Sequence, residues 1–292
     1  MLGFCALMLA VLSGAILAHS QTPAPAITGG APDDQPFPPY RIIGNIYYVG
    51  TTDITSYLIA TPAGHILVNS GYEDTPRIIA DSIAKLGFKL KDVKILLNSQ
   101  AHFDHVAGQA EMQRLTGAKI YSSGREVAVL ESGGKADTRF GREVTYPPVK
   151  VDHVVQDLEK ITLGGATLVA HMTPGHSIGC TTWTMRVTEG GKIYDVVIVG
   201  GTTINPGVEF LKHPTYPGIA DDYARTFRIL HGLKCDIFLG AHGGYYGMRE
   251  KYDRMQKGTG ANPFIDPDGY RAFIDKSEKN FQKKLAEEKA AQ

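Results

Sequence analysis

The loop from Asn98 to His105 (NSQAHFDH) carries more potential metal ligands than any other segment of the chain. It follows the apolar run Val93–Leu97, which predicts a buried strand, and precedes a helical pattern of apolar residues through Met112 and Leu115. The loop therefore joins a strand to a helix. Imidazole nitrogen and carboxylate oxygen are donors that zinc prefers, so we expect a metal site at the end of this strand, with ligands among Gln100, His102, Asp104 and His105.

Two further histidines stand in turns that resemble this loop in position. His176 lies in the sequence TPGHS after a predicted strand that ends at Met172, and His242 lies in GAHGG after a strand that ends at Leu239. Both turns contain glycine, which lets a ligand approach the backbone closely. We predict that both bind metal. The remaining internal histidines have no such framing and are interpreted as packing, surface or turn residues: His65, His153, His171, His213 and His231.

The rest of the sequence predicts alternating strand and helix segments. Strands are expected at 41–49, 56–60, 64–68, 93–97, 118–121, 161–163, 167–172, 181–187, 193–199 and 237–239, and helices at 74–86, 125–130, 219–230 and from about 270 to the C-terminal end. No internal linker interrupts this pattern. It favours a single α/β domain over residues 40–292, built as packed sheets flanked by helices.

The N-terminal residues have the composition of an export signal. The run from Leu2 to Leu17 is almost wholly apolar but short for a membrane span, and the sequence Ala18-His19-Ser20 fits a cleavage site, although a basic segment is missing at the start. We expect residues 1–20 to be a signal peptide, residues 21–39 to be a flexible lead-in rich in proline, alanine and glycine, and the mature protein to be periplasmic. An uncleaved N-terminal anchor is the alternative.

Charge and cysteine content bear on partners and compartment. The 30 basic and 30 acidic residues balance, and no basic block is present, so we expect no nucleic-acid partner and no membrane surface. We also expect a monomer. Cleavage of the signal would leave Cys180 and Cys235 in an oxidising compartment. A disulfide between them and two buried free thiols both remain possible.

Taken together, these motifs resemble the metallo-β-lactamase superfamily, whose usual loop is His-x-His-x-Asp-His. The stretch from Gly50 to Ile59, the turn GHSIGCTTW that begins at Gly175, and the sequence INPG that begins at Ile204, followed by Tyr216-Pro217, are similar to subclass B3 of the β-lactamases. The similarity covers roughly residues 40–275. It implies an α/β fold of the superfamily's αβ/βα sandwich type.

The resemblance also implies two zinc sites. Gln100, His102 and His176 would form the first, and Asp104, His105 and His242 the second, with Asp104 also catalytic. Gln100 stands where the family usually has histidine. Because an amide oxygen is a weaker zinc donor than imidazole, the first site should bind zinc less tightly than the second, and the enzyme is expected to bind up to two Zn²⁺ ions. Thr202 is the expected contact for the substrate carboxylate.

The function that follows is zinc-dependent hydrolysis of the β-lactam amide in penicillins, cephalosporins and carbapenems, conferring antibiotic resistance. Zinc lowers the pKa of a bound water molecule to near 7, so hydroxide attacks without a protein nucleophile. An exported lactonase or another hydrolase of the superfamily is the alternative. Such enzymes usually carry a further aspartate between the metals, and Gly201 stands in its place. A binding protein with one structural zinc is disfavoured because the ligand set contains no cysteine.

Overall fold

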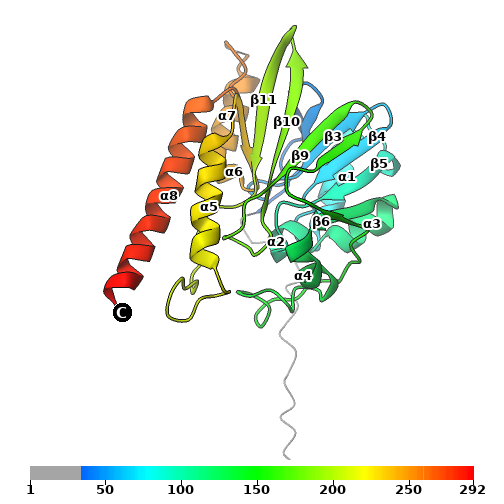
Figure 1. The fold of residues 1–292 in the computed structure, drawn as a ribbon. Helices are drawn as coiled ribbons and strands as arrows, with labels where there is room; N and C mark the ends of the chain where they lie inside the picture. The colour runs from blue at the N-terminus through cyan, green and yellow to red at the C-terminus, as the bar shows by residue number, and fades with distance from the viewer. Residues whose placement is uncertain (1–33, 259) are drawn as a thin grey trace, which may run out of the picture.

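The structure, a computed structural model, describes residues 34–258 and 260–292 (Figure 1). The predicted signal peptide, residues 1–20, and the lead-in up to residue 33 lie outside the described residues. Within the described part, no helix is long and apolar enough to cross a membrane.

The first sheet has seven strands in chain order. Four antiparallel strands are followed by three that run parallel to the fourth, and the pairs β4–β5, β5–β6 and β6–β7 are all parallel. The strands are β1 (Tyr40–Ile43), β2 (Ile46–Tyr48), β3 (Tyr57–Thr61), β4 (Gly64–Val68), β5 (Val93–Leu97), β6 (Lys119–Ser123) and β7 (His153–Val155).

The second sheet has five strands in the order β12-β11-β10-β9-β8. Only the pair β11–β12 is parallel; the others are antiparallel hairpin neighbours. The strands are β8 (Lys160–Leu163), β9 (Ala166–Met172), β10 (Thr181–Glu189), β11 (Lys192–Val199) and β12 (Ile237–Gly240).

Helices cover the outer faces of the two sheets (Figure 1). The first group comprises α1 (Thr75–Lys85), α2 (Phe103–Val106), α3 (Gln109–Thr116) and α4 (Val127–Glu131), and the second α5 (Ile219–Gly232), α6 (Gly243–Tyr246), α7 (Met248–Gln256) and α8 (Pro267–Ala290). One apolar cluster fills the space between the sheets and continues under α5 and α8, and another lies between the first sheet and its helices. This arrangement confirms the predicted αβ/βα sandwich.

The N-terminal part of the domain differs from its prediction. The predicted strand 41–49 is a hairpin, because Gly44 has a φ of 53° and turns the chain between β1 and β2. The end of the predicted flexible lead-in is packed: Pro36 forms a bridge with Thr51, and the Phe37 ring lies 4.9 Å from that of Tyr252. Residues 34–39 therefore belong to the domain, held by contacts with partners far along the chain.

The two cysteines that the structure describes are free and buried. Cys180 follows the turn that carries His176, and Cys235 precedes β12. Of the two states left open by the sequence, the structure has the buried thiols. Burial raises the pKa of both, that of Cys235 to about 12.

Candidate metal centre

The ligand loop is fixed by polar contacts from both sheets. The side-chain Oδ1 of Asn69, a residue with a φ of 64°, accepts hydrogen bonds from the Ser99 amide at 2.9 Å and from its hydroxyl at 3.0 Å. From the other sheet, the Trp183 indole donates to the Asn98 carbonyl at 2.9 Å. The loop therefore leaves β5 in one orientation, with Gln100, His102, Asp104 and His105 on the side where β9 and β12 also end.

Two of these side chains form a compact group with His242, here called the second triad: Asp104, His105 and His242. One ligand atom from each lies within 4.8 Å of the others. Asp104 Oδ2 is 3.3 Å from His105 Nε2 and 3.7 Å from His242 Nε2. The structure thus brings together side chains from the strand-to-helix loop and from the turn after β12, as the sequence predicts.

The first triad consists of Gln100, His102 and His176. The imidazoles of His102 and His176 are adjacent, with ring centroids 4.8 Å apart. Gln100 is fully buried, and its Nε2 donates to the Gly200 carbonyl at 3.3 Å, which leaves Oε1 as the free end of the amide. The glycine at 175 is required for this turn, because its φ is 134° and a Cβ there would lie 2.8 Å from the Tyr223 ring.

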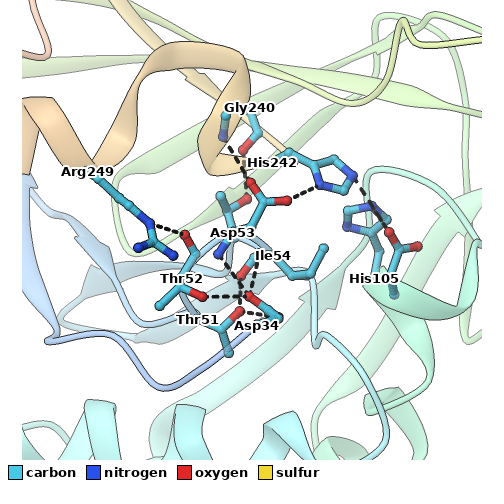
Figure 2. Close-up of polar contacts among 12 residues, drawn as sticks. Asp34, Thr51, Thr52, Asp53, Ile54, His105, Gly240, His242 and Arg249 are labelled. Carbon is cyan, nitrogen blue, oxygen red and sulfur yellow. Dashed lines mark hydrogen bonds and ion pairs between the residues drawn. The ribbon is translucent and has the colours of Figure 1, made fainter. Parts of the chain in front are cut away.

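Asp137 Oδ2 lies 3.6 Å from His102 Nε2, which is beyond hydrogen-bond distance. Two other histidines are hydrogen-bonded to an oxygen: Thr203 O lies 2.7 Å from His176 Nδ1, and Asp53 Oδ2 lies 2.8 Å from His242 Nδ1 (Figure 2 shows Asp53 and His242). Such partners fix the ring and its tautomer, and the opposite nitrogen stays available. Sequence reasoning missed Asp53 and Asp137, which are distant in sequence from the histidines they contact. The only signal was that each lies in a loop outside the predicted strands and helices.

The imidazoles of the site differ in proton affinity. Burial lowers the pKa of His102 to about 4 and that of His176 to about 3, and it holds the pKa of His105 well below its usual range. Burial also acts against the charge on His242, but the hydrogen bond with Asp53 and the charge of Asp104 outweigh it and raise its pKa. Three of the four rings are therefore neutral at pH 7, the form that binds a metal ion.

Buried polar atoms without partners test whether a metal fits here. Gln100 Oε1 and both ring nitrogens of His105 form no hydrogen bond with any residue that the structure describes, although both side chains are fully buried. The Nε2 of His105 has only the 3.3 Å approach of Asp104 Oδ2. Such atoms are costly to bury unless another group satisfies them. A cation would do so, and the donor set of imidazole, carboxylate and amide oxygen suits zinc.

A cavity of about 400 Å³ opens over both triads. It is lined by Asp53, His102, Phe103, Asp104, Phe140, His176, Thr203, Asn205, His242, Gly244 and Tyr245. Thr202, the expected substrate contact, is not in this lining: it is 2% exposed and its hydroxyl lies 3.1 Å from that of Ser277 on α8. Its neighbour Thr203 lines the cavity instead.

Gly201 lies against the first triad. A Cβ at this position would be 2.5 Å from Cδ2 of His176, closer than real side chains come. The glycine leaves the space that the His176 ring occupies. An aspartate here would require that ring to move.

Glu126 is a buried carboxyl group behind the His176 turn. Its Oε1 accepts hydrogen bonds from the Ser177 hydroxyl and from the Gly179 amide, the latter at 3.2 Å. Burial raises its pKa to about 7, and the nearby charge of Asp137 acts in the same direction. Glu126 therefore fastens the turn that carries a ligand. The sequence indicated only a helical segment here.

Comparison with known proteins agrees with this geometry. The family model described as the metallo-beta-lactamase superfamily matches residues 49–242. A curated relative, the probable metallo-hydrolase MJ0888 of Methanocaldococcus jannaschii, is 24% identical over 151 residues, which are 51% of this chain and 66% of that protein. The chain thus spans just under two thirds of that relative.

Solved structures are similar over nearly the whole chain. The FEZ-1 metallo-β-lactamase of Legionella gormanii is 45% identical, with a TM-score of 0.87 over 89% of this chain and 99% of its own. BJP-1, a subclass B3 enzyme of Bradyrhizobium japonicum, is 40% identical, with a TM-score of 0.81 over 88% and 97%. LRA-12, a class B3 di-zinc enzyme from an Alaskan soil metagenome, is 35% identical, with a TM-score of 0.83 over 90% and 100%. The chain therefore belongs to the metallo-β-lactamase superfamily and, within it, to the subclass B3 metallo-β-lactamases, which are hydrolases.

Proposed function

We propose that the protein hydrolyses the β-lactam amide of penicillins, cephalosporins and carbapenems at a zinc centre held by the two triads. The observation that carries this proposal is the convergence of Asp104, His105 and His242 within 4.8 Å, beside a cavity that Asp104 and His242 line. Similarity to FEZ-1, itself a metallo-β-lactamase, supports the reaction.

Each group of the cavity has a role in this proposal. Zinc, when bound, supplies an activated water molecule and polarises the lactam carbonyl. Asp104 is 18% exposed, so one of its oxygens can orient the attacking water while the other faces the metal. Thr203 and Asn205 line the cavity, and we propose that their polar groups contact the substrate carboxylate, the role expected from sequence for Thr202.

The two triads are proposed to bind zinc unequally. The second triad has a carboxylate and two imidazoles, whereas the first replaces one imidazole by the neutral amide of Gln100. Since amide oxygen is the weaker donor, the second triad should fill first. The enzyme would then be a variant of the all-histidine loop that binds up to two zinc ions, as the di-zinc LRA-12 does.

The proposal also covers the location, the oligomeric state and the partners of the protein. The signal peptide and the periplasmic location would place the enzyme where antibiotics reach it, so that its activity confers resistance. We propose a monomer that acts on small β-lactams without a nucleic-acid or membrane partner. The alternative, an exported lactonase, is disfavoured because Gly201 leaves no space for the aspartate that such enzymes carry.

Hydrolysis of one member of each antibiotic class tests this proposal. The purified protein with added zinc should open the lactam ring of at least one of a penicillin, a cephalosporin and a carbapenem. The loss of ultraviolet absorbance of each antibiotic measures the reaction. A homoserine lactone serves as the comparison substrate. Intact β-lactams together with an opened lactone would favour the alternative.

A further inference from the structure

The carboxylate of Asp34, the first residue that the structure describes, is joined to the turn at residues 51–54. The Thr51 hydroxyl donates to Oδ2 at 2.6 Å, and the backbone amides of Asp53 and Ile54 donate to Oδ1 at 2.9 and 3.2 Å (Figure 2). Hydrogen bonds to a charged acceptor are the stronger kind. One side chain therefore fixes the backbone of this turn.

Residues next to Asp34 add backbone contacts to the same turn. The Gln35 amide donates to the Thr52 hydroxyl at 2.9 Å, and the Thr52 amide donates to the Gln35 carbonyl at 2.8 Å. Pro36 bridges Thr51. Residues 34–36 thus lie along the turn and pair with it.

The opposite side of the turn contacts the segment that carries His242. Ile54 bridges His242, and the Gly243 amide donates to the Asp53 carbonyl at 2.7 Å. The side chain of Asp53 spans the same junction, with Oδ2 2.8 Å from His242 Nδ1 and Oδ1 accepting from the Gly244 amide at 3.0 Å. The turn is consequently held between Asp34 and the ligand.

These contacts form a continuous path from Asp34 through Asp53 to His242. Asp34 binds the amide of the residue whose carboxylate orients the imidazole, so loss of Asp34 releases the backbone on which that carboxylate is mounted. A shift of that backbone matters because an outer partner determines the ring orientation of a metal ligand. Asp34 neither lines the cavity nor hydrogen-bonds to a ligand, and its charge raises the pKa of His242 less than the charges of Asp104 and Asp53 do.

We propose that Asp34 is a positioning residue for the second triad and acts through Asp53. This inference rests on the proposed zinc centre. It makes the segment just before β1 part of the active-site scaffold, and zinc affinity at one triad depends on it.

The test measures zinc binding to metal-free full-length protein by competition with a chromophoric chelator. Loss of a direct outer partner weakens metal binding about 10- to 100-fold, so Asp34→Asn, one step further away, should weaken the tighter zinc site about tenfold and leave the weaker site unchanged. The matched control is Asp152→Asn, since Asp152 accepts the Ile120 amide at 2.9 Å at the start of β6, away from the site. The control should leave both zinc affinities unchanged.

A double variant separates positioning from general destabilisation. If Asp34 acts through Asp53, Asp34→Asn should weaken zinc binding little further once Asp53→Asn is present. Additive losses, or an unchanged tighter site in Asp34→Asn, would overturn the inference. Thr51→Val, which removes one of the bonds to Asp34, gives a milder variant should Asp34→Asn fold poorly, and it should weaken the same site by a few fold. A wild-type protein that binds no zinc would instead refute the zinc centre itself.

Discussion

Asp53 and His242 lie 189 positions apart in the chain, yet Oδ2 of the first is 2.8 Å from Nδ1 of the second. Asp53 is on the turn between β2 and β3 of the first sheet, and His242 follows β12 of the second. The pair therefore joins the two sheets at the edge where the ligands gather. The hydrogen bond with His242 is the main cause that lowers the pKa of Asp53, so the carboxylate is ionised at neutral pH.

Asp53→Asn should weaken zinc binding at the second triad. The amide keeps the shape of the carboxylate but loses the charge that orients and polarises the imidazole, and we expect a loss of affinity of about 10- to 100-fold. Chelator competition on the metal-free protein measures it. An unchanged affinity would mean that Asp53 does not support the ligand.

Gln100→His should tighten the weaker of the two zinc sites. Imidazole replaces the free amide oxygen, and we expect the affinity of the first triad to rise about tenfold or more. Gln113→His, on the half-buried face of α3, is the control for an added histidine and should change neither site. The expectation is wrong if the wild-type protein binds two zinc ions equally tightly, or if Gln100→His binds as the wild type does.

Gly201→Ala should damage the first triad without unfolding the protein. The new methyl group would lie 2.5 Å from Cδ2 of His176 and force a ring that Thr203 holds at 2.7 Å to move. A displacement of about 1 Å at a reacting site can lower a rate about 100-fold. The control is Gly232→Ala at the end of α5, where a Cβ meets nothing within 4 Å. Equal hydrolysis rates in the two variants would contradict the steric argument.

Glu126→Gln should change how stability depends on pH. The folded protein raises the pKa of Glu126 from 4.5 to about 7, so between these values the folded state holds a proton that the unfolded chain releases. Protonated Glu126 therefore adds up to about 3 kcal/mol to the free energy of unfolding. This contribution is fully present below about pH 4.5 and is lost as the pH rises through 7.

The variant lacks this titration. Urea denaturation of the metal-free proteins measures the free energy of unfolding of each. The value for Glu126→Gln minus the value for the wild type should increase between pH 5 and pH 7.5, because only the wild type loses this contribution. The contribution of the buried histidines to the pH dependence is the same in both proteins and cancels in this difference. Their contribution has the opposite sign, because they are neutral when folded and take up protons on unfolding in acid. Parallel curves would show that the Glu126 carboxyl has an ordinary pKa.

Local patterns in the sequence were sufficient to predict most of the helices and strands. Apolar periodicity located α1, α5 and α8 and nearly all strands, because each buries a regular face. It missed α7, whose residues are mostly polar, and the three-residue strand β7. The hairpin inside 41–49 was missed because Gly44 interrupts a run that otherwise alternates as one strand.

For the site, the sequence predicted the side chains that the structure brings together at the sheet edge and not those that orient them. His176 and His242 stand in glycine-framed turns at strand ends, which local sequence displays. Asp34, Asp53 and Asp137 act on partners that only the folded sheets bring near. Thr202 and Thr203 are adjacent and chemically alike, so only the direction of each side chain distinguishes the residue that faces the cavity from the one that faces α8.

The most direct test of a catalytic zinc centre at the second triad is the rate of β-lactam hydrolysis as a function of zinc concentration. Protein stripped of metal by a chelator should leave a carbapenem and a cephalosporin intact, and addition of zinc should restore hydrolysis as the second triad fills. Hydrolysis that persists in the stripped protein, or none at any zinc concentration, would contradict a zinc centre at Asp104, His105 and His242.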